Sequence, residues 1–294
     1  MKHARPATLA LALAAGTLAL GGLVTPAAAA GKITVCTDEA VCDQATIQAA
    51  IDEAEAGDVI EVVDDLVVSG TTTITKDVTV TGASGVTVTQ TADAITFVIT
   101  GTGATLSDLT ITSDTPKARE FVQIGANDVT LSGNTIYGPE QALPMSGWVG
   151  NRGFVPRPGV EGLTVTDNTI HTLRTGGYLN PDSTGEISGN TLYNTKGDFL
   201  IDNANFTFTD NRAGDLDKRS EWGFVVFGST AADRYESIAE LSKANNGMTA
   251  VDQRDGDTYV VPLAADDCKK NGWKDLDPGF KNQGQCVKFV TAGK

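Results

Sequence analysis

The sequence predicts an all-β protein, a right-handed parallel β-helix (solenoid) with an N-terminal capping helix and a small disulfide-linked C-terminal tail. Three observations favour this fold class. Short segments of alternating apolar and polar residues recur along the middle of the chain, an Asn recurs at one place in successive repeats, and an amphipathic helix precedes the first repeat. We expect residues 31–228 to form the β-helix with its cap and residues 229–294 to form a C-terminal extension with a short helix.

The repeats share one pattern. Apolar and polar residues alternate, a small or acidic residue and often Asn follow, and a second short strand comes next. The equivalent positions are Ala83, Leu109, Asn134, Asn168, Asn190 and Asn211. The steps between them are 26, 25, 34, 22 and 21 residues, which a coil of about 22 residues explains if the longest step contains an insertion. The absence of crossover helices argues against a doubly wound sheet or a TIM barrel, and the constant register argues against a β-sandwich.

The recurring Asn residues have a structural explanation. At a turn between two sheets of a solenoid, Asn tolerates left-handed backbone angles and its amide can bond backbone groups. Amides stacked on successive coils can also bond one another. We therefore interpret Asn134, Asn168, Asn190 and Asn211 as structural rather than catalytic.

The N-terminal part of the chain supports the same fold. Ile47, Ala50, Ile51 and Ala54 lie on one face of a predicted helix that Gly57 ends. Such a helix would cover the open end of the solenoid. The segments 46–52 and 57–60, followed by the coils, resemble the start of the pectin-lyase-like β-helix superfamily over roughly residues 44–228. This resemblance implies the fold but no single activity, because the superfamily includes lyases, hydrolases, esterases, adhesins and phage spikes.

Residues 1–30 are typical of a secretory signal peptide, with a basic start, an apolar run from Ala7 to Val24 and small residues up to Ala30. We expect a secreted or cell-surface protein with no membrane span. The remaining chain carries 20 of the 22 Lys and Arg against 37 Asp and Glu, a formal charge of −17. Such a surface repels nucleic acid and anionic lipid. An acidic polysaccharide partner would need a local basic groove or a bridging cation, and the acidic surface alternatively just maintains solubility.

Four cysteines allow three disulfide pairings. We favour Cys36–Cys42 and Cys268–Cys286, since each closes a local loop and export makes disulfides expected. A short helix is predicted over residues 234–243. Residues 266–294, which include Trp273 between two cysteines, are similar to a short Cys–Trp–Cys tail on many secreted actinobacterial proteins of unlike function.

Two cations are the candidate catalytic groups. Arg174 and Lys196 lie six residues after Asn168 and Asn190, so they occupy the same place on adjacent coils. A lyase acting on uronic acids needs a cation to neutralise the substrate carboxylate and a base to remove the C5 proton. Some β-helix uronate lyases resemble this arrangement, with the Lys before the Arg and calcium-binding acids upstream, whereas here the Arg comes first. We assign Arg174 and Lys196 as base and neutraliser and Tyr178 as acid, against the alternative of surface ion pairs.

An insertion in the third coil, Pro139–Val160, is the main irregularity of the pattern. It contains Trp148, Arg152 and Arg157, and aromatic and Arg side chains suit sugar stacking and carboxylate pairing. Long loops on a rigid scaffold often carry function. The alternative is a loop that only shields apolar surface.

A second column, Tyr137, His171 and Tyr193, lies three residues after the Asn column. It predicts either a sugar-binding strip, with His171 and Tyr193 as substrate-binding residues, or aromatic packing between coils. Asp198 and Asp202 are candidate calcium ligands or hydrolase acids, although the multi-Asp pattern of inverting hydrolases is not seen.

The sequence therefore predicts a β-helix that engages polysaccharide, with β-elimination on a uronate-containing polymer as the leading reaction and calcium as the candidate cofactor. The alternative is a non-catalytic cell-surface, adhesive or carbohydrate-binding protein. The threonine-rich strands also suggest an array that binds ordered water. The sequence indicates that this array ends near residue 135, and Thr is ordinary on exposed strands.

Overall fold

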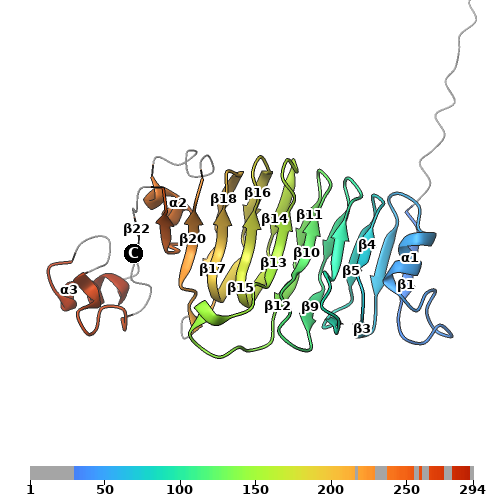
Figure 1. Cartoon of the computed structure of the whole chain (residues 1–294), viewed down its shortest axis with the longest axis horizontal. Coiled ribbons are helices and arrows are strands. Elements are labelled where there is room, and N and C mark those ends of the chain that lie inside the picture. The colour runs from blue at the N-terminus through green and yellow to red at the C-terminus, as the bar shows by residue number, and fades with distance from the viewer. Residues whose placement is uncertain are drawn as a thin grey trace, which may run out of the picture.

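The computed structural model describes residues 30–215, 218–228, 237–254, 258–259, 265–274 and 280–291. Within them the predicted parallel β-helix is confirmed, because strands of successive coils stack side by side along one long axis (Figure 1). The predicted signal peptide lies outside the described residues except for Ala30. In the described part of the chain, no helix has the length and apolarity needed to span a bilayer.

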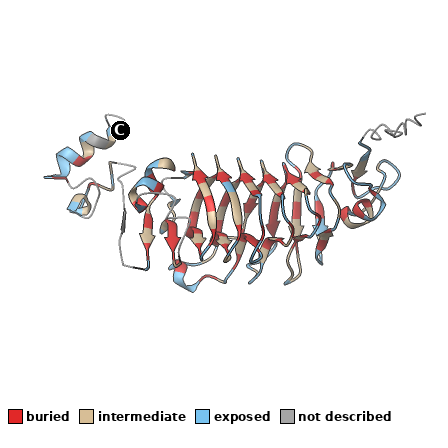
Figure 2. Cartoon of the chain, turned by 90° about the horizontal axis from the view of Figure 1, so that it is seen from above, coloured by how far each residue is buried: buried red, intermediate tan, exposed pale blue. Residues whose placement is uncertain are grey.

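One sheet, which we call sheet A, contains eight strands that pair in parallel from the first coil to the last. Its strands are β1 (Lys32–Val35), β2 (Val59–Val62), β5 (Thr79–Gly82), β8 (Thr105–Ser107), β11 (Thr130–Ser132), β14 (Leu163–Thr166), β16 (Thr184–Ser188) and β18 (Asn205–Thr209). Alternate residues point inward, as period two requires, and the inward positions are buried (Figure 2).

The second sheet bends into two faces. The first face contains β3 (Leu66–Val68), β6 (Thr87–Gln90), β9 (Thr110–Ser113), β12 (Thr135–Tyr137) and β19 (Arg212–Ala213). The second contains β4 (Thr72–Ile74), β7 (Phe97–Ile99), β10 (Glu120–Ile124), β13 (Arg152–Pro156), β20 (Trp222–Val226) and β21 (Ala250–Asp252), with β22 (Thr258–Tyr259) antiparallel to β21. The long strands β15 (Thr169–Leu179) and β17 (Thr191–Ile201) run through both faces and bend at Thr172 and Asn194, whose φ angles are 55° and 51°. We call the outer surface of β10, β13, β15, β17 and β20 the pocket face.

The predicted Asn ladder is confirmed. From Asn168 onward, each Asn Oδ1 accepts hydrogen bonds from the backbone N–H and the side-chain amide of the Asn one coil earlier, as from Asn168 to Asn190 at 2.9 and 3.0 Å, whereas Asn134 Oδ1 accepts from the Leu109 N–H. The ladder continues past Asn211 to Asn245, which the sequence pattern did not identify. Parallel pairing also continues past residue 228, because β21 pairs with β20 in the same sheet.

Short helices cover both ends of the solenoid. Helix α1 (Ile47–Glu53) buries Ile47, Ala50 and Ile51 as predicted, and Thr46 caps it by accepting a hydrogen bond from the Ala49 N–H at 3.1 Å. Helix α2 (Ile238–Ala244) lies within the segment predicted to be helical, apart from its last residue, and packs on β18 and β21. The first three residues of that predicted helix lie outside the described residues.

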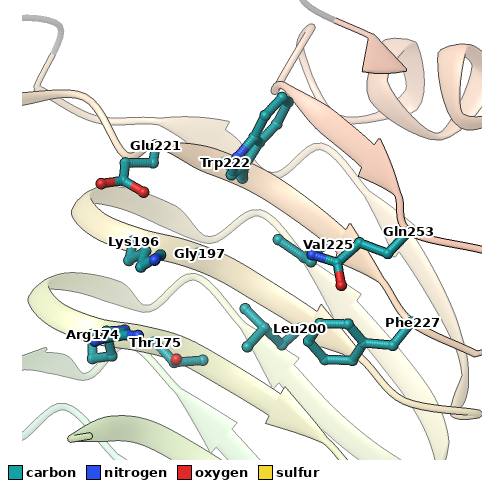
Figure 3. Close-up of a pocket in the computed structure, with 10 residues that line it drawn as sticks. All are labelled: Arg174, Thr175, Lys196, Gly197, Leu200, Glu221, Trp222, Val225, Phe227 and Gln253. Carbon is teal, nitrogen blue, oxygen red and sulfur yellow. The ribbon is translucent and has the colours of Figure 1, made fainter. Parts of the chain in front are cut away.

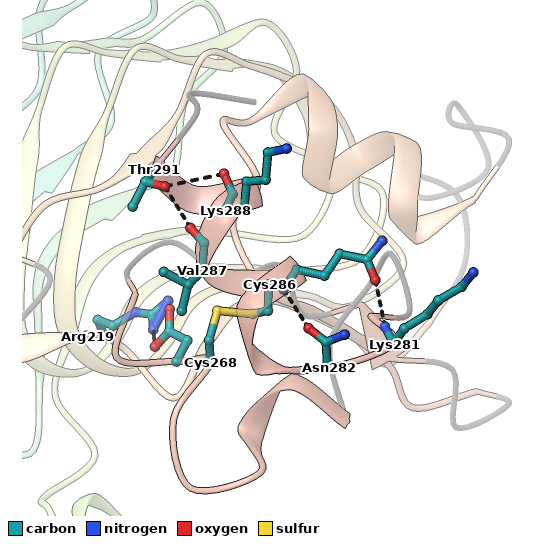
Figure 4. The surroundings of a disulfide bond; sticks show 10 residues. Arg219, Cys268, Lys281, Asn282, Cys286, Val287, Lys288 and Thr291 are labelled. Atoms are coloured by element: carbon teal, nitrogen blue, oxygen red, sulfur yellow. Dashed lines mark hydrogen bonds and ion pairs between the residues drawn. A yellow bond between two sulfur atoms is a disulfide. The ribbon is translucent and has the colours of Figure 1, made fainter.

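Both predicted disulfides are confirmed, Cys36–Cys42 and Cys268–Cys286. The second joins the turn before η4 (Gly272–Lys274) to helix α3 (Gln283–Thr291) and forms a small separate core with Phe280 (Figure 4). An ion pair between Arg219 and Asp267 links this tail to the segment that precedes β20.

Candidate functional site

A pocket of about 360 Å³ opens on the pocket face, where β15, β17 and β20 lie side by side. Thr175, Gly197 and Trp222 are in register across these three strands. The pocket is lined by Arg174, Thr175, Lys196, Gly197, Leu200, Glu221, Trp222, Val225, Phe227 and Gln253. Figure 3 shows Arg174, Lys196 and Glu221 in a row on successive strands at one end, with Leu200, Phe227 and Gln253 at the other.

The structure brings Arg174 and Lys196 together at this pocket, between the registered pairs Leu173–Thr195 and Thr175–Gly197. Their side chains differ in their hydrogen-bond partners. Arg174 Nη1 donates to the carbonyl oxygens of Ser146 at 2.9 Å and Trp148 at 3.1 Å, and so holds the preceding loop. Lys196 Nζ has no hydrogen-bond or ion-pair partner among the residues that the structure describes. Lys196 Nζ is therefore available to a ligand, whereas Arg174 keeps its charge but already donates to the loop.

Tyr178 lies on the same face as the pocket and contacts its edge. Its ring centroid is 6.2 Å from that of Phe227, and the Arg152 guanidinium lies 5.3 Å from the Tyr178 ring centroid. The Tyr178 hydroxyl donates to Asp202 Oδ2 at 3.3 Å. Burial, and then the nearby Asp202 carboxylate, raise the pKa of Tyr178, so the phenol stays protonated at neutral pH.

The predicted insertion is only partly a loop. Its second half contains β13, which pairs with β10 and β15 and places Arg152 and Arg157 on or beside the pocket face. Arg157 donates to Gln123 Oε1 through Nη2 at 2.6 Å and Nε at 3.1 Å, so its partner is neutral. Arg152 lies 3.9 Å from a Glu120 carboxylate oxygen.

Trp148 is placed differently from its predicted substrate-binding role. It follows the short turn η1 (Met145–Gly147), is 5% exposed, and donates its indole N–H to the Ala142 carbonyl oxygen at 3.0 Å. A ring buried in this way has no open face for a sugar. Trp148 therefore holds the loop together, as the shielding alternative expects.

The aromatic column Tyr137, His171 and Tyr193 forms a stack on the outer surface of β12, β15 and β17, away from the pocket. Ring centroids are 4.9 Å apart between Tyr137 and His171 and 4.5 Å between His171 and Tyr193. Both faces of His171 are covered by tyrosines, and the ring is half buried. His171 therefore offers its ring edge rather than a face to a ligand.

Asp198 and Asp202, the predicted metal ligands, have different partners. Asp198 is 2% exposed and accepts hydrogen bonds from Thr195 Oγ1 at 2.8 Å and Ser220 Oγ at 2.6 Å, whereas Asp202 accepts from Tyr178. Within the described residues, no group of three or more His, Cys, Asp and Glu side chains is placed to hold a metal ion. Calcium has no identified site here.

Replacing Asp198 with Asn is expected to stabilise the protein by about 4 kcal/mol at alkaline pH and by only about 1–2 kcal/mol in mild acid. Burial raises the pKa of Asp198 to about 7, against about 3.8 in the ordinary state. The folded wild type therefore holds a proton that the unfolded chain has released, and its stability falls as pH rises between these two values. Urea denaturation at about pH 5 and about pH 8 measures this difference.

Asp202→Asn, just after the end of the same strand, is the matched control and should not reproduce the gain. Asn can still accept the hydroxyl hydrogen bonds of Thr195 and Ser220, so Asp198→Asn isolates the charge. An equal stability difference from wild type at both pH values would contradict a buried carboxyl that titrates near neutrality.

Several pocket residues escaped the sequence interpretation, namely Leu200, Glu221, Trp222, Phe227 and Gln253. The sequence contained a signal for three of them, Glu221, Trp222 and Phe227. The segment 222–227, directly after Glu221, is a short apolar run one further coil length along the chain, since Trp222 follows its register partner Gly197 by 25 residues. The predicted pattern ended at Asn211, so this coil was not aligned with the others.

A family model described as "Right handed beta helix region" matches residues 93–255, more than half of the chain. No curated protein and no solved structure matches the chain. The matched range includes the pocket strands and the Asn ladder, and its hand agrees with the predicted one.

Proposed function

The chain belongs to the right-handed β-helix family, and on this scaffold we propose that it is an exported protein that binds a uronate-containing polysaccharide along the pocket face and cleaves it by β-elimination. The two disulfides support export, because such bonds persist in oxidising surroundings. The family itself supports no particular activity, so the proposal depends on the pocket.

The observation that carries the proposal is a group of cations on one face of an acidic chain. The full chain has a formal charge of −15, yet Arg157, Arg174 and Lys196 lie along the pocket face without an ion-pair partner among the described residues. Their charge is therefore available to an anionic polymer that lies across the coils. These cations would supply the local basic groove that an acidic polysaccharide requires, with the Glu221 carboxylate beside them in the pocket.

The other end of the pocket suits a sugar ring. Phe227 and Leu200 present partly exposed apolar side chains there, Gln253 adds an amide, and Trp222 lies nearer the cations, beside Gly197. Aromatic and apolar surface combined with a few polar groups is the usual lining of a site for a neutral ring. A uronate could thus place its ring on this surface and its carboxylate toward the cations.

In the proposed reaction Lys196 Nζ accepts the C5 proton of the uronate, and the C4–oxygen bond breaks to leave a C4–C5 double bond. Arg174 and the other cations stabilise the charge that develops on the carboxylate. Tyr178, kept protonated by burial, donates a proton to the departing glycosidic oxygen.

Non-catalytic polysaccharide binding or adhesion is the second candidate. It is favoured by the hydrogen bonds that already engage the Arg174 guanidinium and the Tyr178 hydroxyl. In this case the same face would bind the polymer without breaking it.

The test uses purified residues 31–294 and a panel of acidic polysaccharides with and without calcium. Ultraviolet absorbance of the unsaturated uronate reports elimination, and calorimetry reports binding. An absorbance rise on a uronate polymer supports the lyase, and binding without a rise moves the assignment to the second candidate. Absence of both across the panel would reject polysaccharide as the ligand of this face.

A further inference from the structure

The outer face of sheet A differs in chemistry from the rest of the molecule. From β5 to β18 every outward position is Thr or Ser except Glu186 and, at the start of β18, Asn205. One row is Thr79, Thr105, Thr130, Thr164, Glu186 and Thr207, and the other is Thr81, Ser107, Ser132, Thr166, Ser188 and Thr209. The array therefore does not end near residue 135, as the sequence suggested, but extends over six coils.

Strand register fixes these hydroxyl groups in a lattice. Neighbours in a row are about 4.8 Å apart and the two rows about 6.6 Å apart, the spacings of adjacent parallel strands and of alternate residues along a strand. Hydroxyl groups in one row contact each other between coils, as Ser107 Oγ donates to Thr81 Oγ1 at 3.0 Å. Thr side chains also have few rotamers, so binding orders them at little entropic cost.

Strand propensity alone does not explain this face. The pocket face has the same strand geometry but carries Arg, Tyr, Trp and Leu at its outward positions. On sheet A the two rows contain one charged residue, Glu186, in a chain with a net charge of −15. The rows begin on β5, the strand next to β2, whose Glu61 pairs with Lys32 of β1. A regular surface of hydroxyl and methyl groups is thus maintained over six coils, and carboxylates lie at its edge, where Thr81 donates to Asp108 and Thr166 to Asp167.

We infer that sheet A binds the surface of ice. Each Thr hydroxyl offers one donor and two acceptors, and an ice surface offers water molecules with fixed donors and acceptors in a regular lattice. The absence of aromatic side chains from the two rows disfavours a crystalline polysaccharide, whose rings stack on aromatic surfaces. The site is separate from the pocket and does not depend on the function proposed for it.

The test measures partition of residues 31–294 into slowly growing ice and the inhibition of ice recrystallisation. Wild-type protein should enter the ice, and Thr164→Lys, in the centre of one row, should weaken inhibition about tenfold. Val98→Lys, at an outward position of β7 on the other sheet, is the matched control and should change neither readout. Exclusion of the wild type from ice, or equal effects of the two Lys variants, would overturn the inference.

A gain-of-function variant makes the test independent of folding defects. Glu186→Thr removes the single charge from the two rows and should strengthen inhibition severalfold. Unchanged or weaker inhibition of ice recrystallisation would contradict binding through hydroxyl groups of all six coils. Retention on crystalline chitin or cellulose instead of ice would identify polysaccharide as the occupant and overturn the inference as well.

Discussion

Replacing Asn190 with Ala should lower the free energy of unfolding by about 3 kcal/mol or more, because each buried polar group left without a partner costs about 1–3 kcal/mol. Asn190 is fully buried, and its Oδ1 accepts hydrogen bonds from the Asn168 backbone N–H and side-chain amide. Its own Nδ2 donates to the Val165 and Ser188 carbonyls. The methyl group of Ala replaces none of these interactions and leaves a cavity at the turn.

Urea denaturation of the wild type and the variant measures the change. Asn127→Ala is the control, because the Asn127 side chain is exposed and accepts one hydrogen bond from the Glu161 N–H at 3.0 Å. We expect the control to cost less than about 1 kcal/mol. A comparable cost for both variants would mean that the ladder does not contribute more than an ordinary turn.

The ladder matters for the site as well as for stability. Asn190 begins the turn that leads into β17, and Lys196 follows it by six residues. The same spacing from Asn168 places Arg174 on the neighbouring strand. A ladder that fixes the register of successive turns therefore also fixes which side chains meet at the pocket.

Features that follow from local repetition could be predicted from the sequence. The Asn column, the buried face of α1 and the adjacency of Arg174 and Lys196 each depend on a regular spacing, and the structure shows each of them. The two disulfides close short loops, which limits their partners. In these cases the neighbours in space are set by position within one coil.

Features that depend on departures from the repeat could not be predicted. Strict alternation would place Asp198 outward with Lys196 and Leu200, but Asp198 is buried, where Thr195 and Ser220 donate to it. The hydrogen bonds of Arg174 depend on the path of an irregular loop. Asn245 comes 34 residues after Asn211, a step that pattern alone could not distinguish from the end of the ladder.

Lys196→Met should abolish the proposed elimination, with a rate loss of about 100-fold or more, because general base catalysis contributes about 10²–10⁴-fold. Met keeps the length of the side chain and removes the amine. Lys196 Nζ has no partner within the described residues, so the melting temperature should stay at the wild-type value. The rate of unsaturated uronate formation and a thermal melt of the same samples measure both effects.

Arg174→Met, compared with Lys196→Met, distinguishes an effect on stability from an effect on activity at the same pocket. Because Arg174 holds the carbonyl oxygens of Ser146 and Trp148, this variant should lower both stability and activity, whereas Lys196→Met lowers activity alone. A Lys196→Met protein that is folded, binds the polymer and still forms product at the wild-type rate would eliminate Lys196 as the base. If neither the wild type nor Lys196→Met forms product, but Lys196→Met binds the polymer more weakly than the wild type, Lys196 is a binding residue and the pocket face is non-catalytic.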